Sequence, residues 1–336
     1  MKKILLIGGS LNQSQIVHQV GKHLENDFDC YYTPYYADGI VDFLAQKNLL
    51  NFTILGPNSN FFRQSIRYFE ENNLKIDYKG ISNEYDLVIT SQDLIVPKNI
   101  RNKKIILIQE GMTDPENFLF YLVKYLKLPR WIASTATTGL SDAYKYFCVA
   151  SEGYRELFIR KGVKAEKIVV TGIPNFDNIE QYRNNNFPYK NYVLAATSDA
   201  RETFKFENRH EFIRKVKKIA KGRQIIFKLH PNEIFDRAIR EIKEIIPEAI
   251  IFTDGDIKPM IANCDVLVTS YSSVVYYGIA LNKEVYSNFD LETLIKMTPI
   301  QNGGTSALKI ANIARSLVFS APSETEKLVL AMDIKF

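Results

Sequence analysis

The sequence has little of several residue types, and each scarcity argues against a class of protein or site. Its 336 residues include three cysteines and four histidines. Cys30, Cys148 and Cys264 lie far apart with no CxxC pair, so we expect reduced thiols in a cytoplasmic protein rather than a disulfide framework. The histidines have no HxxxH or HExxH spacing, which argues against a zinc centre. No window holds eighteen uninterrupted apolar residues, so no transmembrane helix is expected.

The charge of the chain is also small. The formal net charge is +5 and is spread along the sequence, which argues against a nucleic-acid partner. A hydrophobic content of 46% and a charged content of 24% are those of an ordinary globular protein. At this length two domains are expected. The opening MKKILLIGGS has only a short apolar run before Gly8, so it predicts a first β-strand rather than a signal peptide.

Apolar runs of strand length alternate with helical patterns along the whole chain. The expected strands are 3–7, 86–90, 105–109, 146–150, 168–171, 192–196, 224–229, 249–252, 265–269 and 284–286. The expected helices are 13–25, 61–72, 117–126, 151–161, 211–221, one within 235–246, 259–263 and 274–281. This alternation indicates right-handed βαβ units and parallel sheets.

A polar, asparagine-rich segment at 183–188 (RNNNFP) is the expected linker between two halves of this kind. The sequence therefore predicts an α/β protein with two doubly wound, Rossmann-like domains that face each other across a cleft. The first domain is expected at 1–183 and the second at 189–320. Whether the C-terminal segment 321–336 returns to the first domain stays open.

One strand end in the second half is the first candidate site. The stretch IIFKLHPNE, at residues 225–233, ends a strand just before His230, and Pro231 then turns the chain out of the sheet. An imidazole at that edge can donate a hydrogen bond to a phosphate oxygen and stabilise a departing nucleotide phosphate. The alternative is a histidine that satisfies a local carbonyl group.

A second strand end, in DVLVTSYSSVVYYG at 265–278, carries Ser270, Tyr271, Ser272 and Ser273. These residues precede a helix, where first-turn N–H groups and the helix dipole favour an anion. The alternative is that a serine caps the helix and binds no ligand. Because ligands of open α/β sheets bind outside the carboxyl ends of the strands, we expect His230 to lie side by side with these serines.

In the first domain Glu110 follows the strand IILIQ and precedes Gly111, so it occupies the place that His230 occupies in the second. A carboxylate there is suited to take a proton from an acceptor hydroxyl. Asp114 is the reserve candidate for the same role. The alternative is that Glu110 or Asp114 caps the helix that Pro115 opens.

Three further patterns have simpler interpretations. Asp254-Gly255-Asp256 has the form of a metal-binding DxD pair, but no other carboxylate or histidine cluster accompanies it, so we interpret it as a turn and a helix cap and predict no metal or other cofactor. Gly8-Gly9-Ser10 lacks the third glycine of a dinucleotide fingerprint and is expected to form a tight turn. FLFYLVKYLKLPRWIA, at 118–133, is either a surface that rests on anionic lipid or a core helix whose lysines reach solvent.

The order of these pieces resembles GT-B, the two-domain fold of nucleotide-sugar glycosyltransferases. KLHP and SYSS resemble the HP and SS motifs of bacterial transferases that use CMP-sialic acid or CMP-3-deoxy-octulosonate, and equally the KLHP and TDYSS segments of CDP-glycerol glycerophosphotransferases. In the first set a short acidic motif ending in glycine supplies the base. IQEG is similar to it and implies Glu110, with Gln109 where a second acid is common. The second set has a histidine-glycine pair that this chain lacks.

A second resemblance is to the non-hydrolysing UDP-N-acetylglucosamine 2-epimerases. VTGIPNFD at 170–177 is similar to their VTGNPxxD, SDARET at 198–203 to their HRREN, and HPNE to their HxNP. Their paired glutamates are replaced here by Ser272, Ser273, Val274 and Val275, and their N-terminal GxRPE is missing. These differences favour the transferase interpretation.

The resemblance implies that a nucleotide binds on the second domain. Its phosphates would meet His230, Pro231 and the turn Ser270–Ser273. Its base and ribose would lie near Thr253 and Pro259, and Ser198 and Arg201 would reach the phosphate or the sugar from the other side.

The implied activity is inverting, metal-independent transfer from a CMP- or CDP-activated sugar or polyol in surface-glycan synthesis. The acceptor would be a glycan or its lipid-linked primer, at the inner face of the cell membrane. Glu110 would be the base, and His230 would steady the leaving nucleotide. The alternatives are a UDP-sugar epimerase and a catalytically silent subunit that binds nucleotide sugars.

Overall fold

The computed structural model describes residues 1–51, 53–202 and 207–319, and it divides into two compact units. Unit 1 consists of Met1–Cys148, Lys161–Pro174 and the chain from Thr305 onward, and unit 2 consists of Val149–Arg160 and Asn175–Gly304. Residues 183–188, the expected linker, lie inside unit 2. Residues 321–336 lie outside the described residues.

The sheet of unit 1, within the described residues, has six strands in the order β2-β1-β3-β4-β5-β6. Their bounds are β1 Lys3–Gly8, β2 Asp29–Pro34, β3 Leu87–Thr90, β4 Lys104–Ile108, β5 Tyr146–Val149 and β6 Ile168–Val170. β1 pairs in parallel with β2 and with β3, where Leu5 lies opposite Tyr31 and Val88. Parallel strands are covered on both faces, which explains the short apolar run at the start of the chain.

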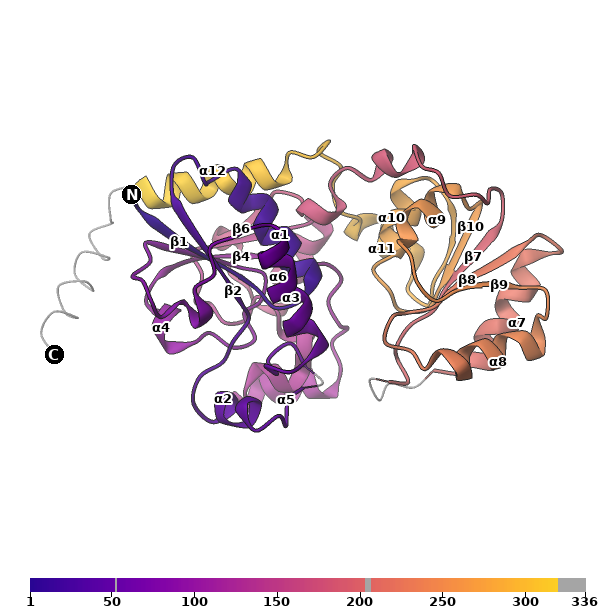
Figure 1. The fold of residues 1–336 in the computed structure, drawn as a ribbon, viewed down its shortest axis with the longest axis horizontal. Helices are drawn as coiled ribbons and strands as arrows, with labels where there is room; N and C mark the ends of the chain where they lie inside the picture. Colours follow the sequence, from indigo (N-terminus) through magenta and orange to yellow (C-terminus); the bar gives the residue numbers. More distant parts are fainter. Residues whose placement is uncertain (52, 203–206, 320–336) are drawn as a thin grey trace, which may run out of the picture. The chain divides into compact units, whose positions relative to one another are not determined.

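The helices of unit 1 include one from the end of the described chain. Their bounds are α1 Leu11–Lys22, α2 Gly39–Gln46, α3 Asn60–Glu71, α4 Lys98–Arg101, α5 Phe118–Leu126 and α12 Ser306–Phe319. α12 packs against α1 (Figure 1). Arg315 of α12 pairs with Asp27 at 2.7 Å, and Lys2 donates to the carbonyl oxygen of Val318 at 2.8 Å. The chain therefore returns to unit 1 through α12.

The sheet of unit 2 has five strands among the described residues, in the order β11-β10-β7-β8-β9. Their bounds are β7 Val193–Ala196, β8 Ile225–Lys228, β9 Ile250–Phe252, β10 Val266–Thr269 and β11 Glu284–Tyr286. The helices are α6 Glu152–Lys161, α7 Arg209–Ala220, α8 Phe235–Ile245, α9 Ile257–Asn263, α10 Val275–Ala280 and α11 Leu291–Met297. β7 is central, and its Ala196 lies opposite both Lys228 and Thr269 in parallel pairings.

The segment 183–188 belongs to unit 2 because its polar groups are satisfied there. Asn185 donates to the side-chain oxygen of Asn263 at 3.0 Å, and Asn263 donates to the carbonyl oxygens of Phe187 and Tyr189, both at 3.1 Å. The asparagine-rich run is therefore folded against the end of α9.

The α/β class with two parallel sheets is confirmed, and the expected strands all form with small changes at their ends. β2 was not predicted, because its DCYYTP mixes tyrosines, a polar start and a proline and lacks the apolar run of the other strands. The helices α2, α4, α11 and α12 were not predicted either. Cys30, Cys148 and Cys264 are unpaired and buried, and burial raises the pKa of each thiol to about 12.

Candidate functional site

Three loops meet the same edge of the unit 2 sheet. They follow β10, β7 and β8, and β7 lies between the other two strands. With neighbouring strands 4.7–4.9 Å apart, β8 and β10 are separated by about 10 Å. His230 and the serine turn thus share an edge, as expected, but the residues after β7, beginning with Thr197, lie between them.

His230 is half-exposed at this edge, with 38% of its side chain accessible. Its backbone N–H donates to the hydroxyl oxygen of Thr197 at 3.0 Å and to Oε2 of Glu233 at 2.9 Å. Its ring atom Nδ1 accepts from the backbone N–H of Asn232 at 3.3 Å and lies 3.7 Å from Oδ2 of Asp199. This ring hydrogen bond comes from an amide N–H, whereas the alternative interpretation predicted one to a carbonyl group.

A buried charge network supports this loop from below. The side chains of Glu233 and Arg209 are 0% and 1% exposed, and Nη2 of Arg209 lies 2.6 Å from Oε1 of Glu233. Nε of the same arginine lies 2.6 Å from Glu207. The pairing offsets the burial of these charges, and Nη2 of Arg209 also donates to the carbonyl oxygen of Ser198 at 3.1 Å. The network therefore holds the ends of β7 and β8 in one arrangement.

Ser198 and Arg201, predicted to reach the phosphate or the sugar, have partners within unit 2. The hydroxyl of Ser198 donates to Glu207 at 2.7 Å. Arg201 makes a two-pronged ion pair with Glu241 of α8, with both N–O distances at 2.9 Å. That hydrogen-bonded carboxylate raises the pKa of Arg201. Arg201 would have to leave Glu241 in order to bind a donor.

The serine turn leads into α10, and Ser272 Oγ accepts from the N–H of Val274 at 3.4 Å, a contact of the kind that the capping alternative predicts. Ser270 is buried, Tyr271 is exposed, and Ser272 and Ser273 are intermediate. The N-cap of α10 is Val274, which makes no side-chain capping bond. Since α10 is short, the helix dipole contributes little here, and the serine hydroxyls are the main polar groups that the turn can offer a ligand.

The neighbouring loop after β9 contains Thr253 and the DxD pair. The carbonyl oxygen of Thr253 accepts from Lys228 at 3.3 Å. Asp256 caps α9 by accepting from the N–H of Lys258 at 3.0 Å. The interpretation of Asp256 as a helix cap is confirmed. Pro259 lies in the first turn of the same helix.

Lys228 was not singled out from the sequence, although it precedes His230 by two residues in KLHP. It is buried, and Nζ donates to the carbonyl oxygens of Leu229 and Thr253. Desolvation lowers its pKa. Asp199, Arg209 and Glu233 were also missed. A glutamate three residues after the histidine, across a proline turn, was the available signal for Glu233.

Glu110, in unit 1, follows β4 and is held by the loop and first turn after β1. Oε1 accepts from the hydroxyl of Ser10 at 3.1 Å and from Asn12 at 3.2 Å, and Oε2 accepts from Gln13 at 2.5 Å. The turn expected at Gly8-Gly9-Ser10 requires glycine at position 8, because a Cβ there would lie 2.7 Å from the Cα of Ser14. This glycine turn therefore brings α1 against Glu110.

Neither acidic candidate caps α5. Asn117 is the N-cap, and its side chain accepts from the N–H of Phe120 at 3.0 Å. Asp114 instead accepts from the hydroxyl of Thr135 at 2.8 Å. The capping alternative for Glu110 and Asp114 is not what this structure shows.

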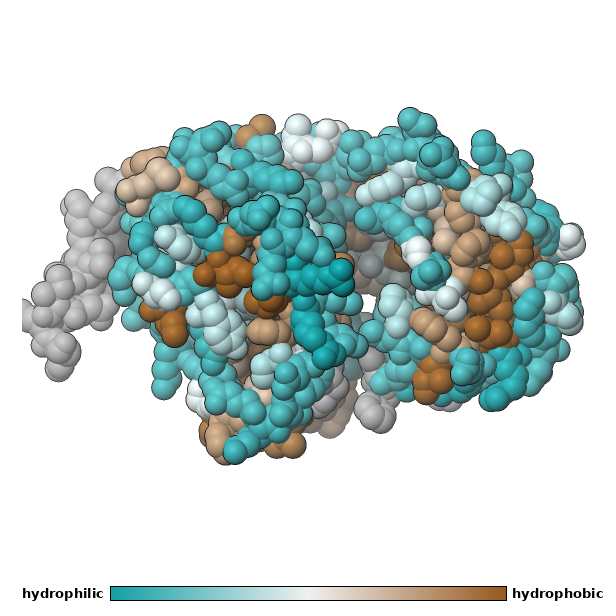
Figure 2. All heavy atoms as spheres, in the orientation of Figure 1, coloured by the Kyte–Doolittle hydropathy of each residue, from teal (hydrophilic) through white to brown (hydrophobic). Residues whose placement is uncertain are grey.

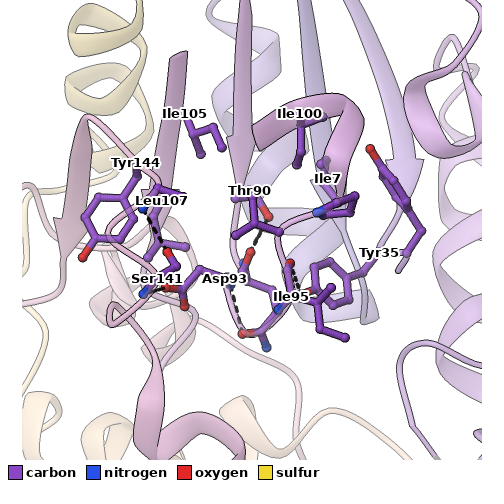
Figure 3. A pocket seen from close by; sticks show the side chains of 15 residues that line it. Ile7, Tyr35, Thr90, Asp93, Ile95, Ile100, Ile105, Leu107, Ser141 and Tyr144 are labelled. Carbon is purple, nitrogen blue, oxygen red and sulfur yellow. Dashed lines mark hydrogen bonds between the residues drawn. The ribbon is translucent and has the colours of Figure 1, made fainter. Parts of the chain in front are cut away.

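A small pocket in unit 1 lies beside β3 and is lined mainly by apolar side chains (Figure 3). The charged residue of its lining is Asp93, whose carboxylate accepts from the N–H groups of Gly139 and Ser141 at 3.0–3.1 Å. Burial raises the pKa of Asp93. Arg130 donates to the carbonyl oxygen of Asp93 at 3.1 Å. The carboxylate joins loops of unit 1 rather than facing solvent.

α5 buries two residues, Phe120 and Val123, and exposes most of its other apolar side chains. Phe118 and Tyr125 are 74% and 73% exposed. Lys124 on α5 and Trp131, in the segment after the helix, are exposed as well.

In the part of the chain that the structure describes, no helix has both the length and the apolar character needed to cross a membrane. Within the same residues, no group of three or more His, Cys, Asp or Glu side chains could hold a metal ion.

Comparisons with known proteins agree with this architecture. Residues 132–293, slightly less than half of the chain, match the model of the CDP-glycerol:poly(glycerophosphate) glycerophosphotransferase family. The match spans β7, β8 and β10 and every candidate residue of unit 2. A search of curated proteins found no match.

Solved structures with the same fold include two UDP-N-acetylglucosamine 2-epimerases. A putative one from Listeria monocytogenes aligns with a TM-score of 0.58 and 13% identity, over 94% of this chain and 96% of that chain. The Methanocaldococcus jannaschii enzyme, in complex with UDP-N-acetylglucosamine and UDP, aligns with a TM-score of 0.52 and 14% identity, over the whole of both chains. At this identity the likeness concerns the fold, which is that of GT-B enzymes.

The wall teichoic acid polymerase TagF also aligns, with a TM-score of 0.46 and 13% identity, over 94% of this chain and 80% of that chain. That likeness is too weak to argue from. The sequence match is the stronger finding: residues 132–293 are similar to the glycerophosphotransferases, a class of transferase.

Proposed function

We propose that the protein transfers a sugar or a polyol phosphate from a CMP- or CDP-activated donor to a hydroxyl group, in the synthesis of a bacterial surface polymer. The reaction is proposed to be inverting and to need no metal ion. The observation that carries the proposal is the family match over residues 132–293, because it covers the strand ends of unit 2 that hold His230.

In this proposal the donor nucleotide binds at the edge of the unit 2 sheet. His230 donates a hydrogen bond to a phosphate oxygen and stabilises the charge of the leaving nucleotide. The hydroxyls of Ser272 and Ser273 add donors on the other side of β7. Lys228 supplies a positive charge beneath the same edge, held on the carbonyl oxygens of Leu229 and Thr253. Thr253 and Pro259 mark the side on which the base and ribose would lie.

Glu110 is proposed as the base that deprotonates the acceptor hydroxyl. Its carboxylate already accepts hydrogen bonds from Ser10, Asn12 and Gln13. A carboxylate has about four lone-pair positions, so one position remains for an acceptor hydroxyl. The three neighbours would keep the carboxylate oriented while it takes the proton.

The acceptor is proposed to be a glycan or its lipid-linked primer, met at the inner face of the cell membrane. The exposed apolar side chains of α5 and the cations beside them support this, because such a surface can rest on anionic lipid. Phe118, Tyr125 and Trp131 would enter the interface, with Lys124 at its polar boundary.

An epimerase is the second candidate, favoured by the fold shared with UDP-N-acetylglucosamine 2-epimerases. It would act on a UDP-sugar with no acceptor. Against it, the turn after β10 carries Ser272 and Ser273 where those enzymes are expected to have glutamates. A silent nucleotide-sugar binding subunit would bind nucleotide and turn over no donor.

A thermal-shift panel of CMP, CDP, CDP-glycerol and UDP separates the transferase from the epimerase, and an assay of donor turnover separates the transferase from the silent subunit. A ligand that binds only the folded state stabilises it by about 2.7 kcal/mol when its concentration is 100 times Kd. We expect CMP or CDP to raise the melting temperature, and His230→Ala to reduce the shift without unfolding the protein. A shift with UDP alone would support the epimerase, and no shift with any nucleotide would rule out all three functions.

A further inference from the structure

The turn that carries His230 determines which nitrogen of its ring can hold a proton. Glu233 N–H donates to the carbonyl oxygen of His230 at 3.0 Å, which closes a four-residue turn with Pro231 at its second position. Within this turn the N–H of Asn232 donates to Nδ1 of the ring at 3.3 Å. An amide N–H can only donate, so Nδ1 must carry a lone pair.

The turn is itself held by two side chains beneath it. His230 N–H donates both to Thr197 Oγ1 at 3.0 Å and to Glu233 Oε2 at 2.9 Å. The Thr197 hydroxyl donates to the same carboxylate oxygen. The other oxygen of Glu233 pairs with Arg209 at 2.6 Å. With Glu233 fully buried, this geometry has little freedom to change.

Asp199 acts on the turn from its outer side. Its Oδ2 accepts from the side-chain amide of Asn232 at 3.0 Å. The same oxygen lies 3.7 Å from Nδ1 of His230, which is too far for a hydrogen bond. Asp199 therefore orients Asn232 and leaves the amide N–H of Asn232 as the hydrogen-bond partner of Nδ1.

We propose that Thr197 and Glu233 are positioning residues that lock neutral His230 in the tautomer with its proton on Nε2. Nδ1 is turned towards the loop, so Nε2 is the nitrogen that meets a ligand at the half-exposed edge. A ring locked in this way presents an N–H donor to an anion, whereas the other tautomer would present a lone pair and repel it. The identity of that anion as a nucleotide phosphate rests on the proposed function.

Nuclear magnetic resonance of the full chain, labelled with ¹⁵N-histidine, reads the tautomer directly. Long-range ¹H–¹⁵N spectra distinguish a protonated ring nitrogen from one with a lone pair, and the spectrum of His230→Gln identifies the signal among the four histidines. We expect neutral His230 to carry its proton on Nε2. A proton on Nδ1, or an even mixture of the two tautomers, overturns the inference.

Substitution of Thr197 tests the positioning role. Thr197→Val removes the hydroxyl at nearly constant volume, and Thr197→Ser keeps it. The valine variant should show a mixture of tautomers and bind CDP about tenfold more weakly, the effect of losing about one hydrogen bond. The serine variant should keep the tautomer and lie within about twofold of the wild-type Kd. If valine changes neither property, Thr197 is not a positioning residue; Thr197→Ala repeats the test should the valine variant fail to fold.

Two replacements of His230 test which nitrogen meets the ligand. Glutamine places an amide N–H near the position of Nε2, and asparagine places one near that of Nδ1. We expect His230→Gln to keep CDP affinity within about fivefold and His230→Asn to lose about tenfold or more. The reverse order overturns the inference. If the wild type binds no nucleotide, the proposed function fails, and the tautomer measurement still decides the inference.

Discussion

Both units place ionisable side chains beyond the carboxyl ends of parallel strands, but they use them in opposite ways. In unit 1 the candidate reactive group is a carboxylate, Glu110, which neutral side chains surround. In unit 2 the carboxylate of Glu233 is buried and holds the backbone of His230, whose imidazole lies at the edge of the sheet. The same kind of sheet edge can therefore offer a base or a hydrogen-bond donor, according to which group is buried beneath it.

The largest expected effect is a loss of stability when the buried charge network of unit 2 is broken. Arg209→Ala leaves Glu207 and Glu233 buried without a counter-charge, and breaking such a pair costs about 3–5 kcal/mol of unfolding free energy. Hydrogen-exchange mass spectrometry should show lost protection in β7, β8 and α7, with unit 1 unchanged. Arg183→Ala removes the exposed ion pair with Glu180 and is the matched control, with a loss below about 1 kcal/mol. Equal losses of unfolding free energy in the two variants would show that the buried network stabilises unit 2 no more than an exposed ion pair does.

Removing the exposed group of unit 2 should act on the reaction and leave stability intact. We expect His230→Ala to lower turnover of the donor by about 10²–10³-fold, the usual effect of deleting one donor that stabilises developing charge. Its melting temperature without ligand should match the wild type, because the backbone N–H that contacts Thr197 and Glu233 remains. Full activity in this variant would remove the assignment of His230.

The corresponding change in unit 1 is Glu110→Gln. The amide keeps the shape of the carboxylate but cannot take a proton, so we expect turnover to fall by about 100-fold if Glu110 is the base. Asp114→Asn is the matched control, since Asp114 is tied to Thr135 and should change turnover by less than about threefold. A large loss in the control with none at Glu110 would transfer the role to Asp114.

The smallest expected effect concerns the buried carboxylate of unit 1. Burial raises the pKa of Asp93 above its ordinary value of 3.8, so the folded state holds this proton more tightly than the unfolded state. Asp93 therefore contributes to the free energy of unfolding at pH values below its pKa in the unfolded state. This contribution is lost as pH rises through its pKa in the folded state. Relative to Asp93→Asn, the wild type should therefore lose stability as pH rises through that window.

Trp131, the single tryptophan of the chain, lies in unit 1 and makes this difference measurable there by fluorescence during urea unfolding. A difference between wild type and Asp93→Asn that stays constant from pH 3 to pH 7 would show that Asp93 titrates alike in both states.

Helix α5 of unit 1 shows a limit of prediction from sequence composition. The run at 118–133 predicted either a lipid-facing surface or, as the favoured interpretation, a core helix whose lysines reach solvent. In the structure Phe120 and Val123 provide the buried contacts of α5, while Phe118, Tyr125 and Leu126 stay exposed. Composition could not separate these outcomes, because the number of apolar residues that a helix buries depends on the neighbours that pack against it.

The sequence by itself determined the alternation of strands and helices, because strands of a parallel sheet are buried on both faces and leave apolar runs that can be recognised locally. It also located His230 and Ser270–Ser273 at strand ends. Tertiary structure alone decided that β7 separates those two strand ends, that Arg201 pairs with Glu241, and that Glu233 meets Arg209. Sheet order and buried ion pairs join residues far apart in the chain, and they are selected by packing and desolvation that no local pattern records.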